Sequence, residues 1–251
     1  FGRMSWYVTL YYFAHVYYSL LGRFKKYKWH FAGGNHHKAY WAWWPKYIQI
    51  PFLRIESFIK QRKILRGKYF LVPLQLCRDF QITEHSNFAN MEEFIKYVIA
   101  NFAANAPAGV KLVIKNHPLD PSFCGMRCVV NKVAAENNVK DRVIFIDGGR
   151  LPTLMDASNG VITVNSTVGL QAIHHKIPTL VLGRSFYAIN GMVNKVNIAE
   201  FLNNPQKPDA ELYKHFRNYV MLQTQVSGSF YEEKGIQRAA EKIAAKIVAF
   251  A

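Results

Sequence analysis

The sequence predicts an α/β protein with a Rossmann-like parallel sheet. From residue 69 onward, short apolar runs alternate with amphipathic segments of helical length, and turn residues separate them. A connection that contains a helix joins parallel strands, so this alternation favours a parallel sheet with helices on both faces. Half of the 251 residues are hydrophobic, which is enough for a substantial core and excludes an intrinsically disordered chain.

Each expected element has a local signal. The apolar runs that predict strands are residues 69–75, 111–115, 143–146, 160–164 and 179–182. The amphipathic stretches that predict helices are residues 91–105, 126–138, 151–158, 167–175, 209–225 and 231–249. Asn90 is a suitable N-cap for the first of these helices, and Pro107 follows its end.

Residues 1–68 differ in composition from the α/β region 69–251. They contain thirteen Lys or Arg and a single acid, Glu56, in a chain of formal charge +16, and they hold all five tryptophans. We interpret them as a basic, aromatic-rich helical segment, a remnant or linker from an N-terminal lobe. Such a segment suits a membrane head-group layer, packing against a partner domain or, less well, nucleic acid. No run reaches the roughly 18 to 20 apolar residues of a membrane span.

The cysteines and the start of the chain give two further expectations. Cys77, Cys124 and Cys128 are too few for a disulfide framework, and no second Cys or His pair completes a zinc site. We therefore expect three reduced thiols. The sequence begins without Met, directly in an aromatic run, so we expect it to be a fragment whose N-terminal portion is missing.

Polar residues follow every predicted strand at its carboxyl end. Together with the turn residues beside them, they are Gln75, Asp79, Gln81 and His85 after the first strand, Asn116 and His117 with Pro118 after the second, Asp147 with Gly148 after the third, Asn165, Ser166 and Thr167 after the fourth, and Arg184 and Tyr187 after the fifth. In an open parallel sheet, ligands bind beyond the carboxyl ends of the strands. This clustering predicts a ligand site at that edge.

The turn from Asn165 to Gly169 is suited to a phosphate. Ser166 or Thr167 can cap the helix that follows, and the helix N-terminus attracts an anion. Gly169 would let the backbone approach a ligand closely. A plain N-cap without a ligand explains the same residues equally well.

His117-Pro118 follows a strand that ends in Lys115. Pro118 holds His117 in the extended region, where its imidazole can donate a hydrogen bond to a phosphate and offset the charge of a leaving group. A loop histidine with a structural hydrogen bond is the alternative. The pairing with a Ser-Thr turn two strands later favours the phosphate interpretation.

Asp79 is the main candidate carboxylate for chemistry or binding, and Asp120 and Asp147 compete with it. Asp120, after Pro118, is more typical of a residue that caps a turn. Asp79 lies just past the first strand and could act as nucleophile or general base. Asp147 precedes Gly148 and is more typical of an Asx turn, although it could contact a nucleotide. The sequence has no Asp-x-Asp pair, so we expect no metal and no cofactor.

A set of runs carries a family resemblance. The runs are Tyr69–Gln75, Asp79–Ile82, His85-Ser86, Lys115–Pro121, Asp147–Gly149, Val164–Gly169, Leu182–Tyr187, Gly228–Tyr231 and Gly235-Ile236. Together they resemble the capsule polysaccharide biosynthesis and export proteins of Gram-negative bacteria, of the KpsS type. The resemblance covers about 69–250 and is faint over 1–68.

That resemblance implies a fold, an activity and partners. The fold would be the C-terminal lobe of a two-lobed, GT-B-like glycosyltransferase, and the activity the transfer of β-Kdo from CMP-Kdo to a (lyso)phosphatidylglycerol-type acceptor or a growing Kdo linker. The enzyme would be peripheral to the cytoplasmic face of the inner membrane. Its partners would be the sugar nucleotide, the lipid acceptor, the membrane surface and other capsule assembly proteins, but not nucleic acid.

The resemblance also implies residue roles. His117-Pro118 matches a His-Pro motif that contacts the CMP phosphate, and Ser166-Thr167 matches a Ser/Thr phosphate motif. Asp79 matches the acidic residue after the first strand of this lobe. The stereochemical course, retaining or inverting, stays open.

Two other functions remain open at this point. A UDP-sugar enzyme, either a GT-B transferase or an epimerase, usually has a glutamate early in the helix after the phosphate turn, where this chain has Gln171. A non-catalytic basic module would bind nucleic acid or a membrane through residues 1–68. Such a module would not explain why polar residues cluster at the ends of the strands.

Overall fold

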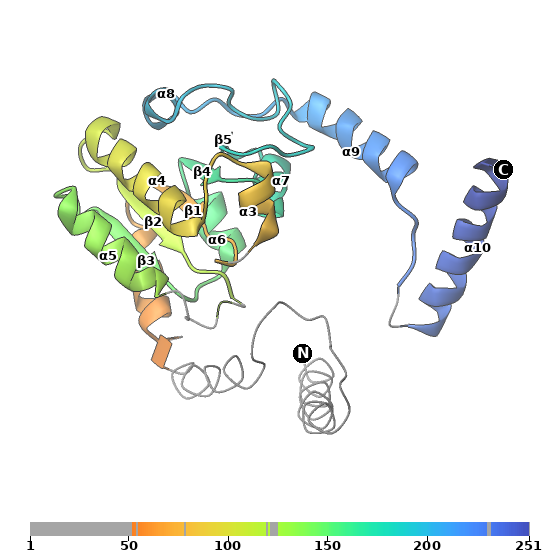
Figure 1. The fold of residues 1–251 in the computed structure, drawn as a ribbon, viewed down its shortest axis with the longest axis horizontal. Coiled ribbons are helices and arrows are strands. Elements are labelled where there is room, and N and C mark those ends of the chain that lie inside the picture. The colour runs from red at the N-terminus through yellow and green to blue at the C-terminus, as the bar shows by residue number, and fades with distance from the viewer. Residues whose placement is uncertain are drawn as a thin grey trace. The chain divides into compact units, whose positions relative to one another are not determined.

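The sheet and its helices are seen in a computed structural model (Figure 1), which describes residues 52–53, 55–77, 79–118, 120, 125–229 and 232–250. All five tryptophans and most of the basic segment expected over 1–68 therefore lie outside the described residues. The chain divides into two compact units, and the larger comprises Leu53–Asp120 and Cys124–Ala251. The fold below is that of the larger unit.

The described strands form one parallel sheet in the order β3-β2-β1-β4-β5. They are β1 Tyr69–Pro73, β2 Lys111–Lys115, β3 Val143–Ile146, β4 Gly160–Thr163 and β5 Thr179–Val181. Every residue of β1 and β4 is buried. Strands covered on both faces are continuously apolar rather than alternating, which is the pattern that these runs show. The predicted α/β class with a parallel sheet is confirmed.

Helices cover both faces of the sheet (Figure 1). The labelled helices are α3 Phe80–His85, α4 Met91–Asn105, α5 Met126–Glu136, α6 Leu151–Asp156, α7 Thr167–His174, α8 Ile198–Asn203, α9 Ala210–Thr224 and α10 Glu233–Phe250. One core joins α4, α5 and α8 to the sheet, and the other joins α6, α7 and the helix over residues 55–64 to it. Alternate residues of β1 supply the two cores, Phe70 and Val72 to the first and Tyr69 and Leu71 to the second.

The observed bounds agree closely with those expected from the sequence, apart from two helices that were not anticipated. β2, β3 and α4 have the predicted ends, and Asn90 caps α4 by accepting a hydrogen bond from the Glu93 N–H. The helices α3 and α8 were not predicted. Each has only six residues. α3 buries Ile82 alone and so shows no apolar period, whereas the period of α8, in Ile198, Phe201 and Leu202, was overlooked.

The helix over residues 55–64 packs into the α/β unit, although its composition resembles the basic segment. Ile64 and Ser57 are both 2% exposed, and the compact unit begins at Leu53, ahead of the boundary between 68 and 69 that composition suggested. Basic residues on a helix do not prevent it from burying one face, because the charges occupy the other.

The two C-terminal helices are the least buried part of the unit. Leu212, Tyr213 and Phe216 on α9 pack beside Ile173 of α7 and Tyr187. Among the described residues, no helix is long and apolar enough to cross a membrane.

One expectation about cysteines is wrong. Cys77, just after β1, is disulfide-bonded, and its partner lies outside the described residues. Cys128 on α5 is free and exposed. A count of cysteines does not show which thiols the fold brings together, and so it missed this bond.

Candidate functional site

The candidate site lies at the carboxyl edge of the sheet, in the loops after β1, β2, β3 and β4; we call it the strand-end site. The chain runs outward from β1 to β2 and β3, and then returns to place β4 on the other side of β1. The loops after β1 and β4 therefore leave the sheet at its topological switch point. This is where open α/β sheets bind their ligands.

Gln75 joins the two loops at the switch point. Its side chain is 8% exposed, and its amide donates to Asp79 Oδ2 at 3.1 Å and to Asn165 Oδ1 at 3.0 Å. The backbone N–H of Asn165 donates in return to Gln75 Oε1 at 3.3 Å. Asn165 also donates to the backbone carbonyl of Gln81 at 2.7 Å. Four of the predicted site residues are thus brought into one hydrogen-bonded junction, although Gln75 and Asn165 are 90 positions apart in the sequence.

Asp79 has two structural partners. Its Oδ1 accepts the Gln81 N–H at 3.0 Å and so caps α3, while its Oδ2 accepts from Gln75. The carboxylate is half-buried and held in one orientation. Each oxygen keeps a further lone pair, so the arrangement allows a chemical role as well as the capping role.

The loop after β2 is organised by Asn116. This side chain is 4% exposed; its Oδ1 accepts the His117 N–H at 2.9 Å, and its amide donates to Asp120 at 3.1 Å and Asp147 at 2.9 Å. The bonds fix the backbone that carries His117, which is partly exposed, and they tie this loop to the end of β3. Pro118 is exposed beside it.

Lys115 is a buried cation beneath this loop. It is 7% exposed, and burial lowers the pKa of its ammonium group, while the negative charge of Asp147 opposes that shift. The ammonium group donates to the Asn116 carbonyl at 3.5 Å, a long hydrogen bond. Lys115 therefore lies beneath the loop rather than on its surface.

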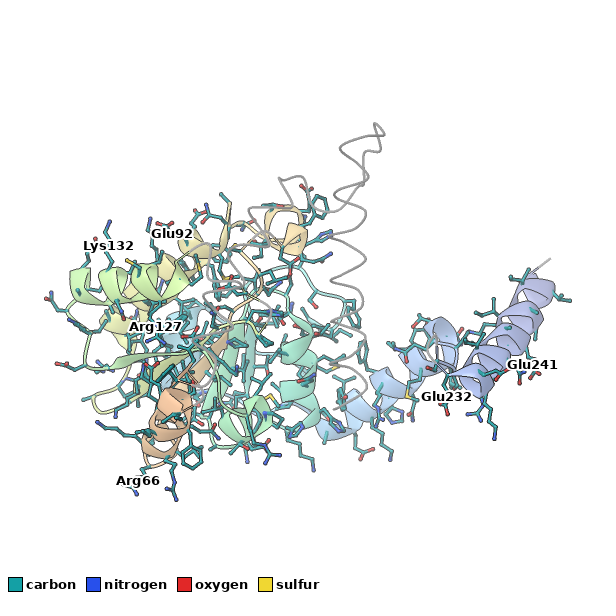
Figure 2. All side chains as sticks on the ribbon, turned by 90° about the horizontal axis from the view of Figure 1, so that it is seen from below. Arg66, Glu92, Arg127, Lys132, Glu232 and Glu241 are labelled. Carbon is teal, nitrogen blue, oxygen red and sulfur yellow. The ribbon has the colours of Figure 1, made fainter. Side chains whose placement is uncertain are left out.

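Asp147 belongs to an ion-pair network that sequence reasoning missed. Arg127 on α5 donates to Asp147 and forms two hydrogen bonds with Glu56, at 2.9 and 3.1 Å. Figure 2 shows Arg127 on the side of α5 that faces the body of the domain, with Lys132 on the outward side. The hydrogen bond from Arg127 lowers the pKa of Glu56 to about 2, and Lys60 lowers it further, against the opposing effect of burial. One feature of the sequence could have pointed to this network, because Glu56 is the single acid in a basic segment.

The residues after Asp147 face the helix over residues 55–64. The Gly148 N–H donates to Ser57 Oγ at 2.9 Å, and a Cβ at Gly148 would lie 2.8 Å from that oxygen. Gly149 has a φ of 82° and packs on Gln61, whose side chain accepts the Arg150 N–H at 3.0 Å. Close packing between loop and helix therefore accounts for Gly148.

The Ser166 turn starts α7. Ser166 Oγ accepts the Val168 N–H at 3.2 Å as the N-cap, and Thr167 is exposed at the first helical position. Tyr187, which is fully buried, donates its hydroxyl hydrogen bond to the Ser166 carbonyl, and burial raises its pKa to about 12. Gly169 packs directly against the Tyr187 ring, where a Cβ would lie 3.0 Å from ring carbons. Tyr187 therefore supports this turn through its hydrogen bond to Ser166, and Gly169 allows the turn to pack closely against the Tyr187 ring.

The loop after β5 meets α3 from the other side. The Arg184 N–H donates to the His85 carbonyl at 2.6 Å, and its guanidinium donates to the Glu84 carbonyl. A Cβ at Gly183 would lie 2.9 Å from the same His85 oxygen. The side chains of His85 and Arg184 are both exposed at the rim of the strand-end site.

The described part of the chain contains no group of three or more His, Cys, Asp or Glu side chains that could hold a metal ion. The arrangement offers a histidine on a fixed loop, a capped helix N-terminus and a buried lysine. These are groups that bind a phosphate. The expectation of metal-free binding stays a prediction.

Comparison with known proteins identifies the family. Residues 6–231 match the family described as "Capsule polysaccharide biosynthesis protein". The chain is 38% identical over 168 residues to the capsule polysaccharide modification protein LipB of Neisseria meningitidis serogroup A, covering 66% of this chain and 40% of that protein. It is 30% identical over 214 residues to the capsule polysaccharide export protein KpsS of Escherichia coli, covering 82% of this chain and 55% of that protein.

Among solved structures, the chain is similar to KpsC of Thermosulfurimonas dismutans, a β-Kdo 2,7 transferase, with a TM-score of 0.39 and 16% identity over 67% of this chain and 62% of that one. That likeness is too low to carry an argument about activity. The chain spans about half the length of the curated relatives, 40% of LipB and 55% of KpsS. On the family match and these identities, the chain belongs to the capsule polysaccharide biosynthesis family.

Proposed function

We propose that this chain is the donor-binding part of a glycosyltransferase of capsule biosynthesis. It would be the C-terminal lobe of a GT-B-like enzyme that takes β-Kdo from CMP-Kdo and transfers it to a (lyso)phosphatidylglycerol-type acceptor or a growing Kdo linker. The enzyme would work at the cytoplasmic face of the inner membrane. Membership of the capsule family supports the process, and the strand-end site supports the binding of a nucleotide.

The main support for this proposal is the hydrogen-bonded junction of Gln75 with Asp79 and Asn165 at the switch point of the sheet. Gln75 fixes the loop after β1 against the loop after β4, so that Asp79 and the N-terminus of α7 face one edge. A sugar nucleotide has a phosphate and a reactive anomeric carbon close together. In this site, the N-terminus of α7 would bind the phosphate, and the carboxylate of Asp79 would act at the anomeric carbon.

Each residue then has a chemical task. His117, on the loop that Asn116 holds, donates a hydrogen bond to the phosphate and stabilises the charge that develops on the departing CMP. Lys115 adds positive charge from beneath the loop. Asp79 acts as nucleophile in a retaining transfer or as general base in an inverting one.

A calorimetric titration with CMP and UMP tests the donor class. We expect CMP to bind at least about tenfold more tightly than UMP, a difference of about 1.4 kcal/mol that one or two base-edge hydrogen bonds can supply. Gln171, exposed on α7, replaces the glutamate usual in UDP-sugar enzymes. Equal affinities, or a preference for UMP, would contradict the cytidine assignment and favour a UDP-sugar enzyme.

The Ser166→Ala variant tests the phosphate turn, with Asn197→Ala as its matched control. Both residues are N-caps, since Ser166 accepts from the Val168 N–H and Asn197 from the Glu200 N–H. Each substitution should cost about 1 kcal/mol of stability. Only Ser166→Ala should also weaken CMP binding; if both variants bind CMP like the wild type, Ser166 is a cap and nothing more.

A further inference from the structure

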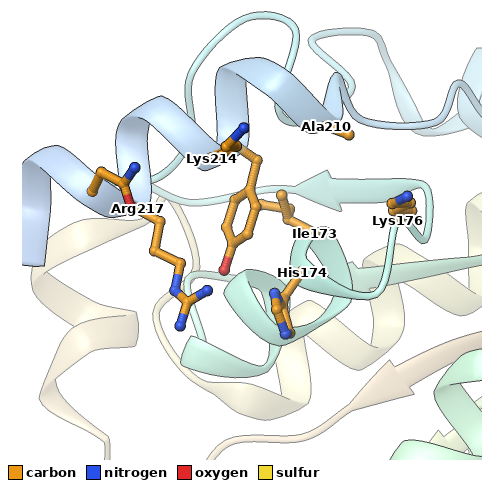
Figure 3. A pocket seen from close by; sticks show the side chains of 8 residues that line it. Ile173, His174, Lys176, Ala210, Lys214 and Arg217 are labelled. Carbon is orange, nitrogen blue, oxygen red and sulfur yellow. The ribbon is translucent and has the colours of Figure 1, made fainter.

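A pocket of about 220 Å³ lies between α7 and α9, and we call it the α7–α9 pocket. α7 begins at the carboxyl edge of the sheet and runs away from it for eight residues, about 12 Å, before it reaches His174. The pocket is therefore at the opposite end of α7 from Ser166 and distinct from the strand-end site. Figure 3 shows the side chains of Arg217 and His174 reaching from α9 and α7 toward the gap between these helices.

The lining of this pocket is strongly cationic. Lys176, Lys214 and Arg217 line it together with His174, and none of its described lining residues is Asp or Glu. Glu211 does lie 3.6 Å from Lys214, but both side chains are largely exposed, and exposed pairs of this kind are weak. The nearby carboxylate of Asp156 pairs with His175 at 2.6 Å. The positive charge of the pocket is thus largely uncompensated.

Lys176 occupies a backbone position that normally takes glycine. It ends α7 with a φ of 60°, and the hydrogen bonds from the N–H groups of Lys176 and Ile177 to Ile173 and Ala172 form a Schellman motif. A non-glycine residue in this conformation costs of order 1 kcal/mol or more. The only other described non-glycine residue with positive φ is Asn138, which ends α5 in the same way and is a tolerated residue there. A lysine in the strained position places its charge at the pocket rim.

Tyr213 adds a neutral donor and an aromatic wall. Its ring centroid lies 5.7 Å from that of His174, and burial raises the pKa of its phenol against the opposing effect of the Arg217 charge. Ile173, which is 1% exposed, provides an apolar floor. The pocket therefore combines exposed cationic side chains, a hydroxyl donor and a small apolar surface.

We propose that the α7–α9 pocket binds a phosphate ester, with Arg217 and Lys176 as its main cationic contacts. A guanidinium can form two parallel hydrogen bonds to phosphate oxygens, and a lysine adds a point charge. The chemistry is shared by an anionic phospholipid head group and by a soluble phosphate ester. The proposal concerns a second site and does not depend on the donor assigned to the strand-end site.

The test is a titration of the full 251-residue chain with inorganic phosphate at low ionic strength, followed by NMR. The side-chain resonances of His174 and Tyr213 report this pocket directly, so phosphate bound at the strand-end site is not mistaken for it. We expect saturable shifts of both resonances. The double variant Lys176→Gly/Arg217→Gln should weaken this binding at least tenfold.

Matched controls separate the pocket from general charge and from folding. Lys132→Gln removes a charge from an exposed residue of α5, and Asn138→Gly alters the other left-handed helix end. Neither should change phosphate affinity. Lys176→Gly should leave the thermal midpoint unchanged or raised, because glycine suits this φ, so its weaker binding cannot be attributed to unfolding. Unchanged affinity in the double variant, or no response of His174 and Tyr213, overturns the proposal.

Co-sedimentation with vesicles then identifies the source of the phosphate. Vesicles of phosphatidylcholine with and without phosphatidylglycerol are compared for the wild type and the double variant. Binding that requires both phosphatidylglycerol and the intact pocket assigns it to a lipid head group. Phosphate binding by the pocket, with vesicle binding that does not depend on it, assigns it to a soluble phosphate ester.

Discussion

Replacing Glu56 by Gln should destabilise the protein in a pH-dependent way. Glu56 accepts two hydrogen bonds from Arg127 and lies 2.7 Å from Lys60, and these cations lower its pKa from 4.5 to about 2. For a fully buried group, such a shift would correspond to roughly 3 kcal/mol. The Glu56 side chain is 36% exposed, so solvent screening reduces the effect, and we expect a loss of about 1 kcal/mol at pH 7.

The sign of the pH dependence follows from the direction of the shift. A carboxyl group with a lowered pKa in the folded state stabilises the fold above its unfolded pKa, and that contribution disappears as the pH falls toward the folded pKa. The free-energy difference between wild type and Glu56→Gln should therefore be constant above about pH 5 and shrink between 4.5 and about 2. Urea unfolding at a series of pH values measures it.

Glu92→Gln is a matched control for this experiment. Glu92 lies 2.7 Å from Lys96 in the same i,i+4 arrangement as Glu56 and Lys60, but it is on the exposed surface of α4. The loss in Glu56→Gln should be clearly larger, because Arg127 also ties Glu56 to Asp147. An equal loss in the two variants, or a Glu56→Gln effect that does not change with pH, would refute the view that this ion pair fastens the helix over residues 55–64 to the domain.

Three further predictions follow from the strand-end site. Asp79→Asn should keep the cap of α3, because Asn is as good an N-cap as Asp. In a transfer assay of the intact enzyme, it should cut kcat by several orders of magnitude with little change in CMP affinity, and near-normal turnover would exclude a catalytic role. Gly169→Ala should cost about 1–3 kcal/mol in urea unfolding, because the added methyl group meets the buried Tyr187 ring, and a change below about 0.5 kcal/mol would contradict that packing. Transfer by the full-length enzyme should be unaffected by a chelator; activity lost with EDTA and restored by Mg²⁺ or Mn²⁺ would contradict metal-free binding.

The parallel α/β architecture and most element bounds could be predicted from the sequence. β2 and α4 have their predicted ends because their signals are local: an apolar run in one case, and an amphipathic period with Asn90 as cap in the other. α3 was missed because it is six residues long and buries only Ile82. Its N-cap, Asp79, was expected to act as nucleophile or general base, or to orient a neighbour such as His85, but not to cap a helix.

The sequence also predicted that the polar residues gather at one edge, since every parallel strand ends there. Which of them touch was decided by the order of the strands. Gln75 reaches Asn165 because β1 pairs with β4, and Asn116 reaches Asp147 because β2 pairs with β3. Strand order depends on the packing of the whole sheet, and no local pattern encodes it.

Glu56 is the clearest example of a residue that the sequence marks as unusual but whose partner only the tertiary structure reveals. Composition marked it as the single acid among thirteen basic residues in 1–68, but its partner Arg127 is 71 residues away on another helix. An ion pair of this kind forms only when two helices pack together. The sequence therefore determines the charges of the two side chains, and the tertiary structure determines that they pair. The same holds for Gly148 and Gly169, whose local context suggested a ligand and whose tertiary neighbours are Ser57 and Tyr187. A glycine lets another group come close to the backbone, and only the tertiary structure shows which group does so.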